Sequence, residues 1–280
     1  MIPPFYGFNV LQTVGGISVT TGQLLNQFYW QGRTQEPVMR QVSLNLSSNL
    51  THGLVFCAYP GGARWDDLVN GGRANLANSV SQWFSTGNWL RYGYGKGATS
   101  TDRTSYPWEE NIATILDQCS IVVGLSVSSL SSTFAGLVSI PYANGTWVAP
   151  FVAMDFTRNS TTSSCNFDYA SSGTLVTVTS DTGMIAADNI NRLYGVTRDG
   201  ATVTFFKDGF QHGAQKTLGT NTVTDWGAKQ DPTIGNRSFS SPGNSMGGTF
   251  TFIGIWNRVL SPSEMTQLFL VPLILLTPTM

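Results

Sequence analysis

Charged side chains are scarce in this 280-residue sequence, since Lys, Arg, Asp and Glu make up 11% of it, against about 25% in an average globular protein. The net charge of −1 gives no electrostatic basis for binding nucleic acid or an anionic membrane, so neither is expected as a partner. Ser, Thr, Asn and Gln supply the polarity instead. A polar but nearly uncharged surface suits dense packing beside copies of the chain or other partners; a general bias in composition is the alternative explanation.

Long apolar runs are also missing. No run of about 18 apolar residues occurs, so no transmembrane segment is expected. The opening stretch, MIPPFYGFNVLQTVGG, does not place a basic region before an apolar one, and we therefore expect no signal peptide.

Cysteine and histidine are too few and too scattered for the usual reactive sites. Cys57, Cys119 and Cys165 are an odd number without metal-ligand spacing, so we expect neither a disulfide framework nor a zinc site. Cys57 and Cys119 lie in apolar stretches, which predicts buried thiols. His52 precedes Cys57 by five residues in an extended segment, which separates their side chains by ~17 Å. A catalytic pair needs about 3 Å, and both His52 and His212 are therefore expected to be structural.

What the sequence does contain is a series of short strand patterns separated by turns. Residues 53–60 (GLVFCAYP) form an apolar run closed by Pro and Gly, which predicts a buried strand. Residues 120–130 alternate Val or Leu with Gly or Ser, the pattern of a half-buried strand. Residues 192–218 hold two Asp-Gly pairs, which predicts a three-stranded antiparallel meander. Residues 249–256 (TFTFIGIW) are apolar on both faces, as expected of a strand between two layers.

One helix is predicted, close to the C-terminus. Ser261, Pro262 and Glu264 supply a cap, a proline at the first helical position and a glutamate three residues after the cap, which is a capping box. Pro272 keeps this helix short. Residues 271–280 form an apolar tail that needs a cover, supplied either by the chain's own strands or by a neighbouring chain.

The first 49 residues differ from the rest, because strand alternation is poor and aromatic residues fall in two clusters. We predict that residues 1–49 form an arm that binds a partner; the alternative is that they wrap the same domain as an extra layer. The partner-binding side chains predicted in this arm are Phe5, Tyr6, Phe8, Phe28, Tyr29 and Trp30.

Three segments near the C-terminus resemble laminin-G-like, or concanavalin A-like, domains. Residues 192–213 (RLYGVTRDGATVTFFKDGFQHG) resemble the family's aromatic hairpin, and residues 231–239 (DPTIGNRSF) its strand with an Ile-Gly pair. Residues 247–269 (GGTFTFIGIWNRVLSPSEMTQLF) are similar to its last buried strand and the helix start that follows. Residues 50–72 match the family's opening strand more loosely. The resemblance implies an all-β fold over residues 50–270, a two-sheet antiparallel jelly roll with one short C-terminal helix and an extended N-terminal arm.

A second, less specific resemblance concerns residues 28–38 (FYWQGRTQEPV) and 50–55 (LTHGLV). These segments look like laminin-G-type proteins encoded in bacteriophage structural gene clusters. The resemblance implies a location in the virion, in a head or a tail, with other virion proteins and copies of the chain as partners. The low charge and the aromatic arm agree with that setting.

Glycoside hydrolases on this sandwich carry Glu-x-Asp-x-Glu on one strand, which puts two carboxylates on one face. The chain has four glutamates, Glu36, Glu109, Glu110 and Glu264, and no Asp/Glu triplet with that spacing. Glu264 belongs to the capping box, and the adjacent Glu109 and Glu110 would face opposite sides of a strand. We therefore predict no catalytic residues and no enzyme.

Sugar binding on such sandwiches uses exposed aromatic residues in loops, beside Asn or Asp. The glycan-binding candidates are Tyr142, Asn144, Trp147, Tyr92 and Tyr94; the alternative is that these aromatics pack at the rim of the core. Many laminin-G relatives hold calcium through loop oxygens. The residues that could serve are Asp66, Asp67, Asp155, Asp168, Asp181 and Asp188; the alternative for each is a turn residue that caps its own backbone. The sequence does not localise a calcium site and predicts no other cofactor.

Three functions remain open at this point. The first is a non-enzymatic virion structural or decoration protein, which assembles as a homo-oligomer through its terminal segments and adheres to surface glycans. The second is a carbohydrate-binding module that recognises a receptor as part of a tail fibre. The third, a glycoside hydrolase, lacks the carboxylate pattern. We expect the first.

Overall fold

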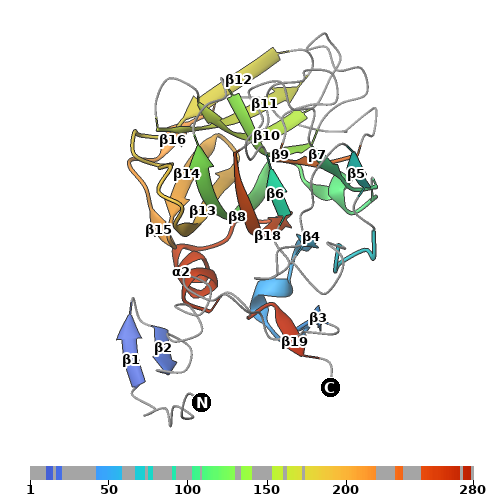
Figure 1. Ribbon diagram of the computed structural model, residues 1–280, viewed down its shortest axis with the longest axis vertical. Helices are drawn as coiled ribbons and strands as arrows, with labels where there is room; N and C mark the ends of the chain where they lie inside the picture. The colour runs from blue at the N-terminus through green and yellow to red at the C-terminus, as the bar shows by residue number, and fades with distance from the viewer. Residues whose placement is uncertain are drawn as a thin grey trace.

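The computed structural model is built from two antiparallel β-sheets packed face to face (Figure 1). It describes residues 11–14, 17–20, 42–58, 67–72, 75–77, 90–92, 103–107, 109–129, 134–140, 153–159, 163–171, 174–218, 231–235, 247–271 and 274–278. The fold is a two-sheet β-sandwich of the jelly-roll type with one short helix near the C-terminus, as the sequence predicts. No helix in these ranges is long and apolar enough to cross a membrane.

The first sheet has seven strands and contains the middle of the chain. All its strand pairs are antiparallel. In spatial order its strands are β12 (Thr174–Thr179), β11 (Cys165–Ser171), β10 (Ala153–Asn159), β9 (Phe134–Ile140), β17 (Thr233–Ile234), β7 (Arg103–Ser105) and β5 (Asn75–Ala77).

The second sheet has eight strands and brings both ends of the sandwich sequence together. Its main path is β15 (Phe210–Gln211), β14 (Thr202–Lys207), β13 (Asn191–Asp199), β8 (Gln118–Ser129), β18 (Gly247–Trp256) and β4 (Leu54–Ala58). Beside this path, β16 (Lys216–Thr217) pairs with β14 and β6 (Leu90–Tyr92) pairs with β18.

The predicted three-stranded meander is confirmed as β13, β14 and β15. At its second turn Asp208 and Gly209 have φ angles of +52° and +82°, which is the type I′ geometry that matches the twist of a hairpin. At its first turn Gly200 has a φ of +56°. The two Asp-Gly pairs thus fix the register of this half of the second sheet.

The main core lies between the sheets. Apolar side chains from both sheets form one buried cluster, in which Phe156, Phe167 and Val138 from the first sheet meet Ile121 and Tyr194 from the second. Cys119 and Cys165 are buried there as free thiols, and Cys57 is a buried free thiol in a second cluster, as predicted for Cys57 and Cys119.

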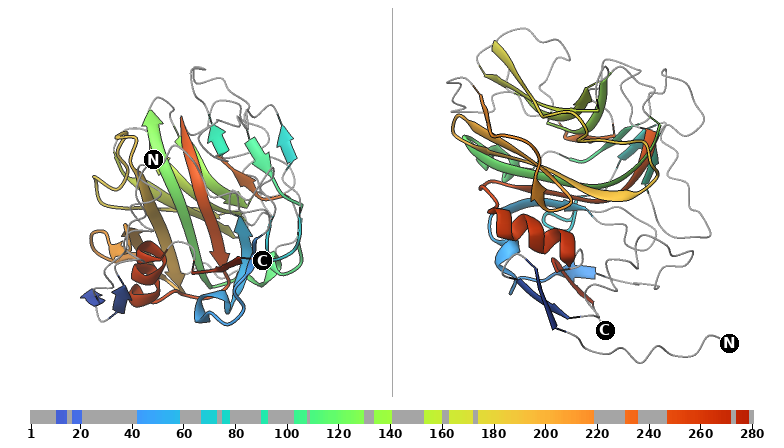
Figure 2. Two further views of the ribbon diagram at one scale, coloured as in Figure 1. Left: turned by 60° about the horizontal axis from the view of Figure 1, so that its bottom comes forward. Right: turned by 90° about the vertical axis from the view of Figure 1, so that its left-hand side faces the viewer.

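The second cluster lies on the outer side of the eight-stranded sheet, beneath helix α2 (Pro262–Leu270) (Figure 2). Strand β18 contributes Ile253 to the main core and Phe252 to this cluster, so the predicted two-sided burial of residues 249–256 is confirmed. The prediction that residues 120–130 are half-buried is wrong for their first part. Ser120 and Val122 are fully buried, because the α2 layer covers the face that the sequence pattern suggested was open.

Parts of both terminal segments lie on the same side of the eight-stranded sheet as α2. Leu275, from the apolar tail, is fully buried in the second cluster. Next to it, β19 (Leu276–Pro278) pairs antiparallel with β3 (Val42–Leu44). The side chain of Leu275 is therefore covered by its own chain. Further toward the N-terminus, the hairpin of β1 (Leu11–Val14) and β2 (Ile17–Thr20) lies outside both sheets, next to α2 (Figure 1, Figure 2).

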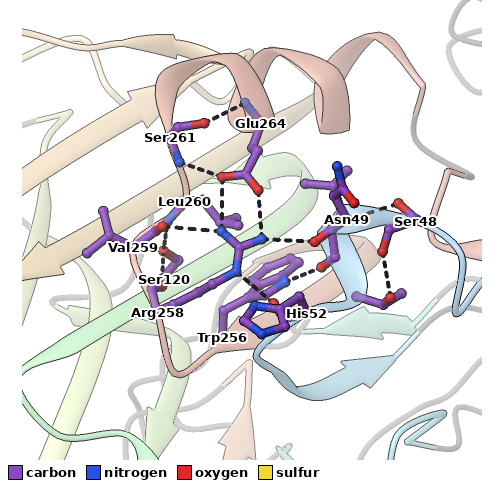
Figure 3. A network of polar contacts seen from close by, with 12 residues as sticks. Ser48, Asn49, His52, Ser120, Trp256, Arg258, Val259, Leu260, Ser261 and Glu264 are labelled. Atoms are coloured by element: carbon purple, nitrogen blue, oxygen red, sulfur yellow. Dashed lines mark hydrogen bonds and ion pairs between the residues drawn. The ribbon is translucent and has the colours of Figure 1, made fainter.

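A polar junction ties the start of the sandwich to its end (Figure 3). The indole Nε1 of Trp256 donates to the carbonyl of Leu50, 2.6 Å away, in the short helix η1 (Asn49–Thr51). Beyond it, the hydroxyl of Ser120 donates to the carbonyl of Arg258 and accepts from the amide of Leu260, both at 2.8 Å. These contacts hold the chain in place just before α2 begins.

The helix begins as predicted. The hydroxyl of Ser261 accepts from the amide of Glu264, and the carboxylate of Glu264 accepts from the amide of Ser261, with Pro262 at the first helical position. This reciprocal pair satisfies two amides that no helical carbonyl can reach.

Candidate functional site

A row of polar residues crosses the whole seven-stranded sheet. The antiparallel register aligns one residue from each strand, and none of these residues is apolar. From edge to edge they are Thr177, Asp168, Asp155, Ser139, Thr233, Ser105 and Asn75. We call this set the polar row.

The polar row lies on the face that points away from the second sheet. Phe167 and Tyr169, the neighbours of Asp168 in β11, belong to the core between the sheets, and so does Val138, the neighbour of Ser139 in β9. Successive side chains of a strand point to opposite faces. Asp168 and Ser139 therefore point outward.

The outward side chains of the central strands are nevertheless buried. Ser139 is 0% exposed and Asp168 is 2% exposed. One register step away, Thr157 of β10 pairs with Asn166 of β11, and these two residues are 0% and 4% exposed. Thr177, on the edge strand β12, is exposed. The polar surface thus runs from an accessible edge into the interior.

Two threonines of the edge strand donate hydrogen bonds to this inner part. The hydroxyl of Thr177 donates to Oδ1 of Asp168 at 2.6 Å, and the hydroxyl of Thr179 donates to Oδ1 of Asn166 at 3.0 Å. The side chains of β11 are therefore held in fixed orientations, as a binding surface requires.

The hydroxyls of Ser139 and Thr157 are buried without any hydrogen-bond partner. Leaving a buried hydroxyl in this state costs about 1–3 kcal/mol. In a native protein such groups call for an explanation, of which an ordered water or a bound ion is one. Both are outward positions on the same face as Asp168, which makes this part of the sheet the strongest candidate site in the described part of the chain.

Most of the residues predicted from the sequence for glycan binding lie outside the described residues. These are Tyr142, Asn144, Trp147 and Tyr94, and the same holds for the six aromatic residues of the arm. Tyr92 lies in β6, where its backbone pairs with Gly248 of β18, but its side chain is not among those described. The roles assigned to all these residues stay predictions.

Two of the calcium candidates are brought together. Asp155 and Asp168 are 13 positions apart in the sequence, yet they are directly opposite each other in the pairing of β10 and β11. Directly opposed residues of an antiparallel pair have Cβ atoms about 4.5–5.5 Å apart. This pairing of two aspartates comes from neighbouring strands, and the spacing of residues along one strand does not reveal it.

The other described aspartates have structural partners. Oδ1 of Asp67 accepts from the amides of Cys57 and Val69, each at 3.0 Å. Asp188 accepts from the amide of Ile190, two residues on, and forms an ion pair with Arg192. Asp181 pairs with Lys216. Asp67 and Asp188 thus cap nearby backbone, which was the alternative explanation for each; Asp66 lies outside the described residues.

Burial dominates the electrostatics around Asp67. It raises the pKa of this carboxyl, and the hydrogen bonds from Cys57, Val69 and Asn70 lower it by less; the charge of Glu109 adds a further rise. The neighbouring thiol of Cys57 has its pKa raised well above the ordinary value, chiefly by burial and then by Asp67.

The remaining thiols follow the same rule. Burial raises the pKa of Cys119 to about 12 and that of Cys165 further still. A thiol with so high a pKa stays protonated at neutral pH and is a poor nucleophile. Among the described side chains, no group of three or more His, Cys, Asp or Glu is arranged to hold a metal ion.

The two histidines make structural contacts. The carbonyl of His52 accepts from Nε of Arg258 at 2.7 Å. The imidazole Nε2 of His212 lies 3.1 Å from the carbonyl of Thr182, so this ring links the β15–β16 connection to the turn that follows β12.

Comparison with known proteins gives a fold likeness without a family. No protein-family model matches the sequence, and no curated protein matches it. Among solved structures, the binding domain of Paraclostridial Mosquitocidal Protein 1 is similar with a TM-score of 0.56 at 13% identity, over 79% of this chain and 52% of that one. The receptor binding domain of botulinum neurotoxin C/D mosaic serotype is similar with a TM-score of 0.57 at 10% identity, over 78% and 51%.

An enzyme of related architecture is also similar. Trypanosoma rangeli sialidase has a TM-score of 0.55 at 13% identity, over 89% of this chain and 38% of the sialidase chain. The chain therefore spans about half the length of the two toxin domains and less of the sialidase. At these identities the likeness establishes a shared β-sandwich fold.

Proposed function

We propose that this chain is a non-enzymatic binding module that recognises carbohydrate through the outer face of the seven-stranded sheet. The observation that carries this proposal is the polar row, with the buried, unpartnered hydroxyls of Ser139 and Thr157 beside it. A sugar presents hydroxyl groups that both donate and accept hydrogen bonds. Such a ligand would first meet the exposed hydroxyl of Thr177, which lies next to Asp168 where the row reaches the edge of the sheet.

The names of the structural neighbours support a binding function. Two of them are described as binding or receptor binding domains, and Trypanosoma rangeli sialidase has been solved in complex with sialic acid. A β-sandwich of this kind therefore occurs in domains that bind receptors and in an enzyme that binds a sugar, and the assignment to this chain rests on its own site.

Binding is favoured over catalysis because the thiols are buried and the carboxylate of Glu264 has a structural role. The three thiols are buried with raised pKa values. Glu264 is held in the capping box of α2. The strand register places Asp155 opposite Asp168, and the experiment therefore includes a test of hydrolysis.

A glycan array with the full chain, followed by titration calorimetry with the best hit, tests the proposal. Thr177→Ala and Asn166→Ala should each weaken binding about tenfold or more, since each removes part of the polar network. Thr202→Ala is the matched control, because Thr202 is an exposed threonine on β14 of the other sheet. It should bind as the wild type does.

Two results would overturn the proposal. One is an array without binding at high protein concentration. The other is release of reducing sugar from a bound oligosaccharide at a rate that Asp168→Asn abolishes, which would make the chain a hydrolase.

A second candidate function is attachment within a virion through the N-terminal segment. It is favoured by the position of the β1–β2 hairpin, which lies outside both sheets and next to α2, and by the resemblance of residues 28–38 to phage structural proteins. An arm of this kind would bury its aromatic residues only on assembly.

Deleting residues 1–41 tests this second function and leaves β3 in place to pair with β19. The shortened chain should keep the melting temperature of the sandwich but lose self-association, measured as particle mass by light scattering. An unchanged mass would contradict the assembly role. Glycan binding should survive the deletion, which separates the two functions.

A further inference from the structure

A second row of polar residues lies beside the polar row and also reaches the edge of the seven-stranded sheet. Thr179 of β12 is opposite Asn166 of β11, and Asn166 is opposite Thr157 of β10. The next residue in this row, Gly136 of β9, has no side chain. Thr179 is exposed, whereas Asn166 and Thr157 are buried. The second row therefore repeats the order of the first, with an exposed threonine at the edge and buried polar groups behind it.

Both exposed threonines donate their hydroxyl protons inward. The hydroxyl of Thr177 donates to Oδ1 of Asp168 at 2.6 Å, and that of Thr179 donates to Oδ1 of Asn166 at 3.0 Å. An ionised carboxylate oxygen and an amide oxygen only accept hydrogen bonds, so neither proton is available to a ligand. A hydroxyl oxygen still has lone pairs after it has donated its one proton. Each threonine hydroxyl therefore offers a ligand an acceptor and no donor.

The spacing of these two acceptors limits what can contact both. Thr177 and Thr179 are two positions apart in β12, so their side chains lie on the same face of the sheet. A strand rises about 3.3–3.4 Å per residue, which separates the two hydroxyl oxygens by about 7 Å. A hydrogen bond between hydroxyl groups spans about 2.5–3.0 Å. One ligand hydroxyl cannot reach both oxygens, and a ligand that contacts both must bring two separate donors.

The described side chains on this face do not include a cation. Those that point outward from β9, β10, β11, β12 and β17 are Ser139, Thr157, Asn166, Asp168, Thr177, Thr179 and Thr233. The carboxylate and sulfate groups of acidic sugars have only lone pairs to offer at neutral pH, and proteins bind such groups through N–H donors and positive charge. Two acceptor oxygens therefore favour neutral groups that donate, such as the hydroxyls and amides of a sugar.

We propose that Thr177 and Thr179 determine the specificity of the carbohydrate site and select a neutral sugar that donates hydrogen bonds from two of its hydroxyl or amide groups. This role rests on the proposed function, because both threonines lie on the face proposed to bind carbohydrate. Each threonine oxygen accepts from one group of the sugar, and its own hydrogen bond to β11 holds it in place. Sialic acid, which is bound to Trypanosoma rangeli sialidase in a solved structure, belongs to the class that these residues disfavour.

The charge of the bound glycans gives the first test. On an array, neutral glycans should bind the full chain, and versions of the same glycans that carry sialic acid or sulfate at a contacted hydroxyl should bind about tenfold more weakly or less. Deoxyfluoro analogues of the best neutral glycan then identify its donors, since a fluorine atom cannot donate a hydrogen bond. Fluorine at either of two hydroxyls should weaken binding about five- to tenfold in titration calorimetry.

Variants assign each hydroxyl of the sugar to one threonine. Thr177→Val removes one acceptor at nearly constant volume and should weaken binding about tenfold, whereas Thr177→Ser keeps the hydroxyl and should restore it. One fluorinated analogue should bind Thr177→Val as well as its parent sugar does, and the other should do so with Thr179→Val, because the partner is already missing. Thr202→Val, at an exposed position of β14 in the other sheet, is the matched control and should show the wild-type loss for both analogues. Melting temperatures check that each variant is folded, and alanine replaces valine where it is not.

Three results would show that the threonines do not have this role: acidic glycans that bind as tightly as neutral ones, fluorinated analogues that bind as tightly as their parent, or equal losses for both analogues in every variant. In each case carbohydrate is still bound, so the proposed function stands and the specificity alone is wrong. An array without any binding has a different meaning, since it removes the proposed function and the specificity with it.

Discussion

Arg258 and Glu264 form a two-point ion pair at the start of α2. Nη1 of Arg258 donates to Oε2 of Glu264 at 3.0 Å, and Nη2 donates to Oε1 at 2.7 Å. The same guanidinium donates to the carbonyls of His52 and Asn49 (Figure 3). One side chain thus links the helix cap to the segment that opens the sandwich.

Replacing Arg258 should cost more than a surface ion pair usually does. Exposed pairs contribute about 0.2–1 kcal/mol, but Arg258→Ala also removes donors from two backbone carbonyls. We expect a loss of about 2 kcal/mol in the free energy of unfolding. Arg258→Lys should recover only part of it, since an ammonium cannot make two parallel hydrogen bonds. Urea unfolding, monitored by tryptophan fluorescence, measures the free energy of unfolding of both variants. If Arg258→Ala loses less stability than Glu264→Ala, Arg258 does not link the helix cap to the start of the sandwich.

The same pair predicts a dependence on pH. Burial raises the pKa of Glu264, but the hydrogen bonds from Arg258 and the amide of Ser261 outweigh it, so that the pKa lies below its ordinary value of 4.5. A carboxyl with a lowered pKa stabilises the fold above its unfolded-state pKa and loses this contribution as pH falls. Below about pH 4.5 the wild type should therefore lose more stability than Glu264→Gln. Urea denaturation at several pH values measures the free energy of unfolding of both proteins. If that free energy falls equally in the two proteins below about pH 4.5, the prediction is wrong.

The contribution of Asp67 to stability should depend on pH in the opposite sense to that of Glu264. Its pKa is raised above 3.8 by burial, so its contribution is most favourable at low pH and is lost as pH rises through the folded-state pKa. The stability of the wild type relative to Asp67→Asn should therefore decline between about pH 4 and neutrality. Asp67→Ala is a second comparison. It leaves the buried amide of Cys57 without its acceptor and should be about 1–3 kcal/mol less stable than Asp67→Asn at every pH. Chemical denaturation across pH would show both effects.

Gly209 and Gly200 form a matched pair for testing how the meander meets α2. Both have positive φ, where a side chain costs about 1–2 kcal/mol. A Cβ on Gly209 would also lie 2.8 Å from Cβ of Phe269, whereas one on Gly200 would meet nothing within 4 Å. Gly209→Ala should therefore destabilise the chain more than Gly200→Ala by at least about 1 kcal/mol. Equal melting temperatures would show that α2 moves aside easily.

Local signals in the sequence predict individual elements of the fold, and the resemblance to laminin-G-like domains implies their arrangement in two sheets. The Asp-Gly pairs fixed two turns because the left-handed backbone they need is confined to a few residue types. Ser261, Pro262 and Glu264 defined a helix start because each satisfies a particular end group. The burial of Ser120 could not be predicted in this way, since it depends on a helix more than a hundred residues later in the sequence.

The candidate site was harder to predict for the same reason. Alternating polar residues are visible in the sequence at Asp155 and Thr157, at Asn166 and Asp168, and at Thr177. Alternation identifies a face of a single strand, but the register between strands decides which residues become neighbours. A search for carboxylates along one strand therefore missed the opposition of Asp155 and Asp168. Loop aromatics such as Trp147 are recognisable from residue type alone, and their role stays a prediction.

The unpartnered hydroxyls allow a prediction that separates a binding site from a merely structural face. If Ser139 and Thr157 are kept for a ligand, removing their hydroxyls should stabilise the ligand-free chain, because each now lacks a partner. Ser139→Ala and Thr157→Val should each raise the free energy of unfolding by about 1 kcal/mol. Thr179→Val, whose hydroxyl has Asn166 as acceptor, should instead lower it. Calorimetric scans without ligand or calcium decide the matter, and lower melting temperatures in all three variants would show that these hydroxyls serve the fold.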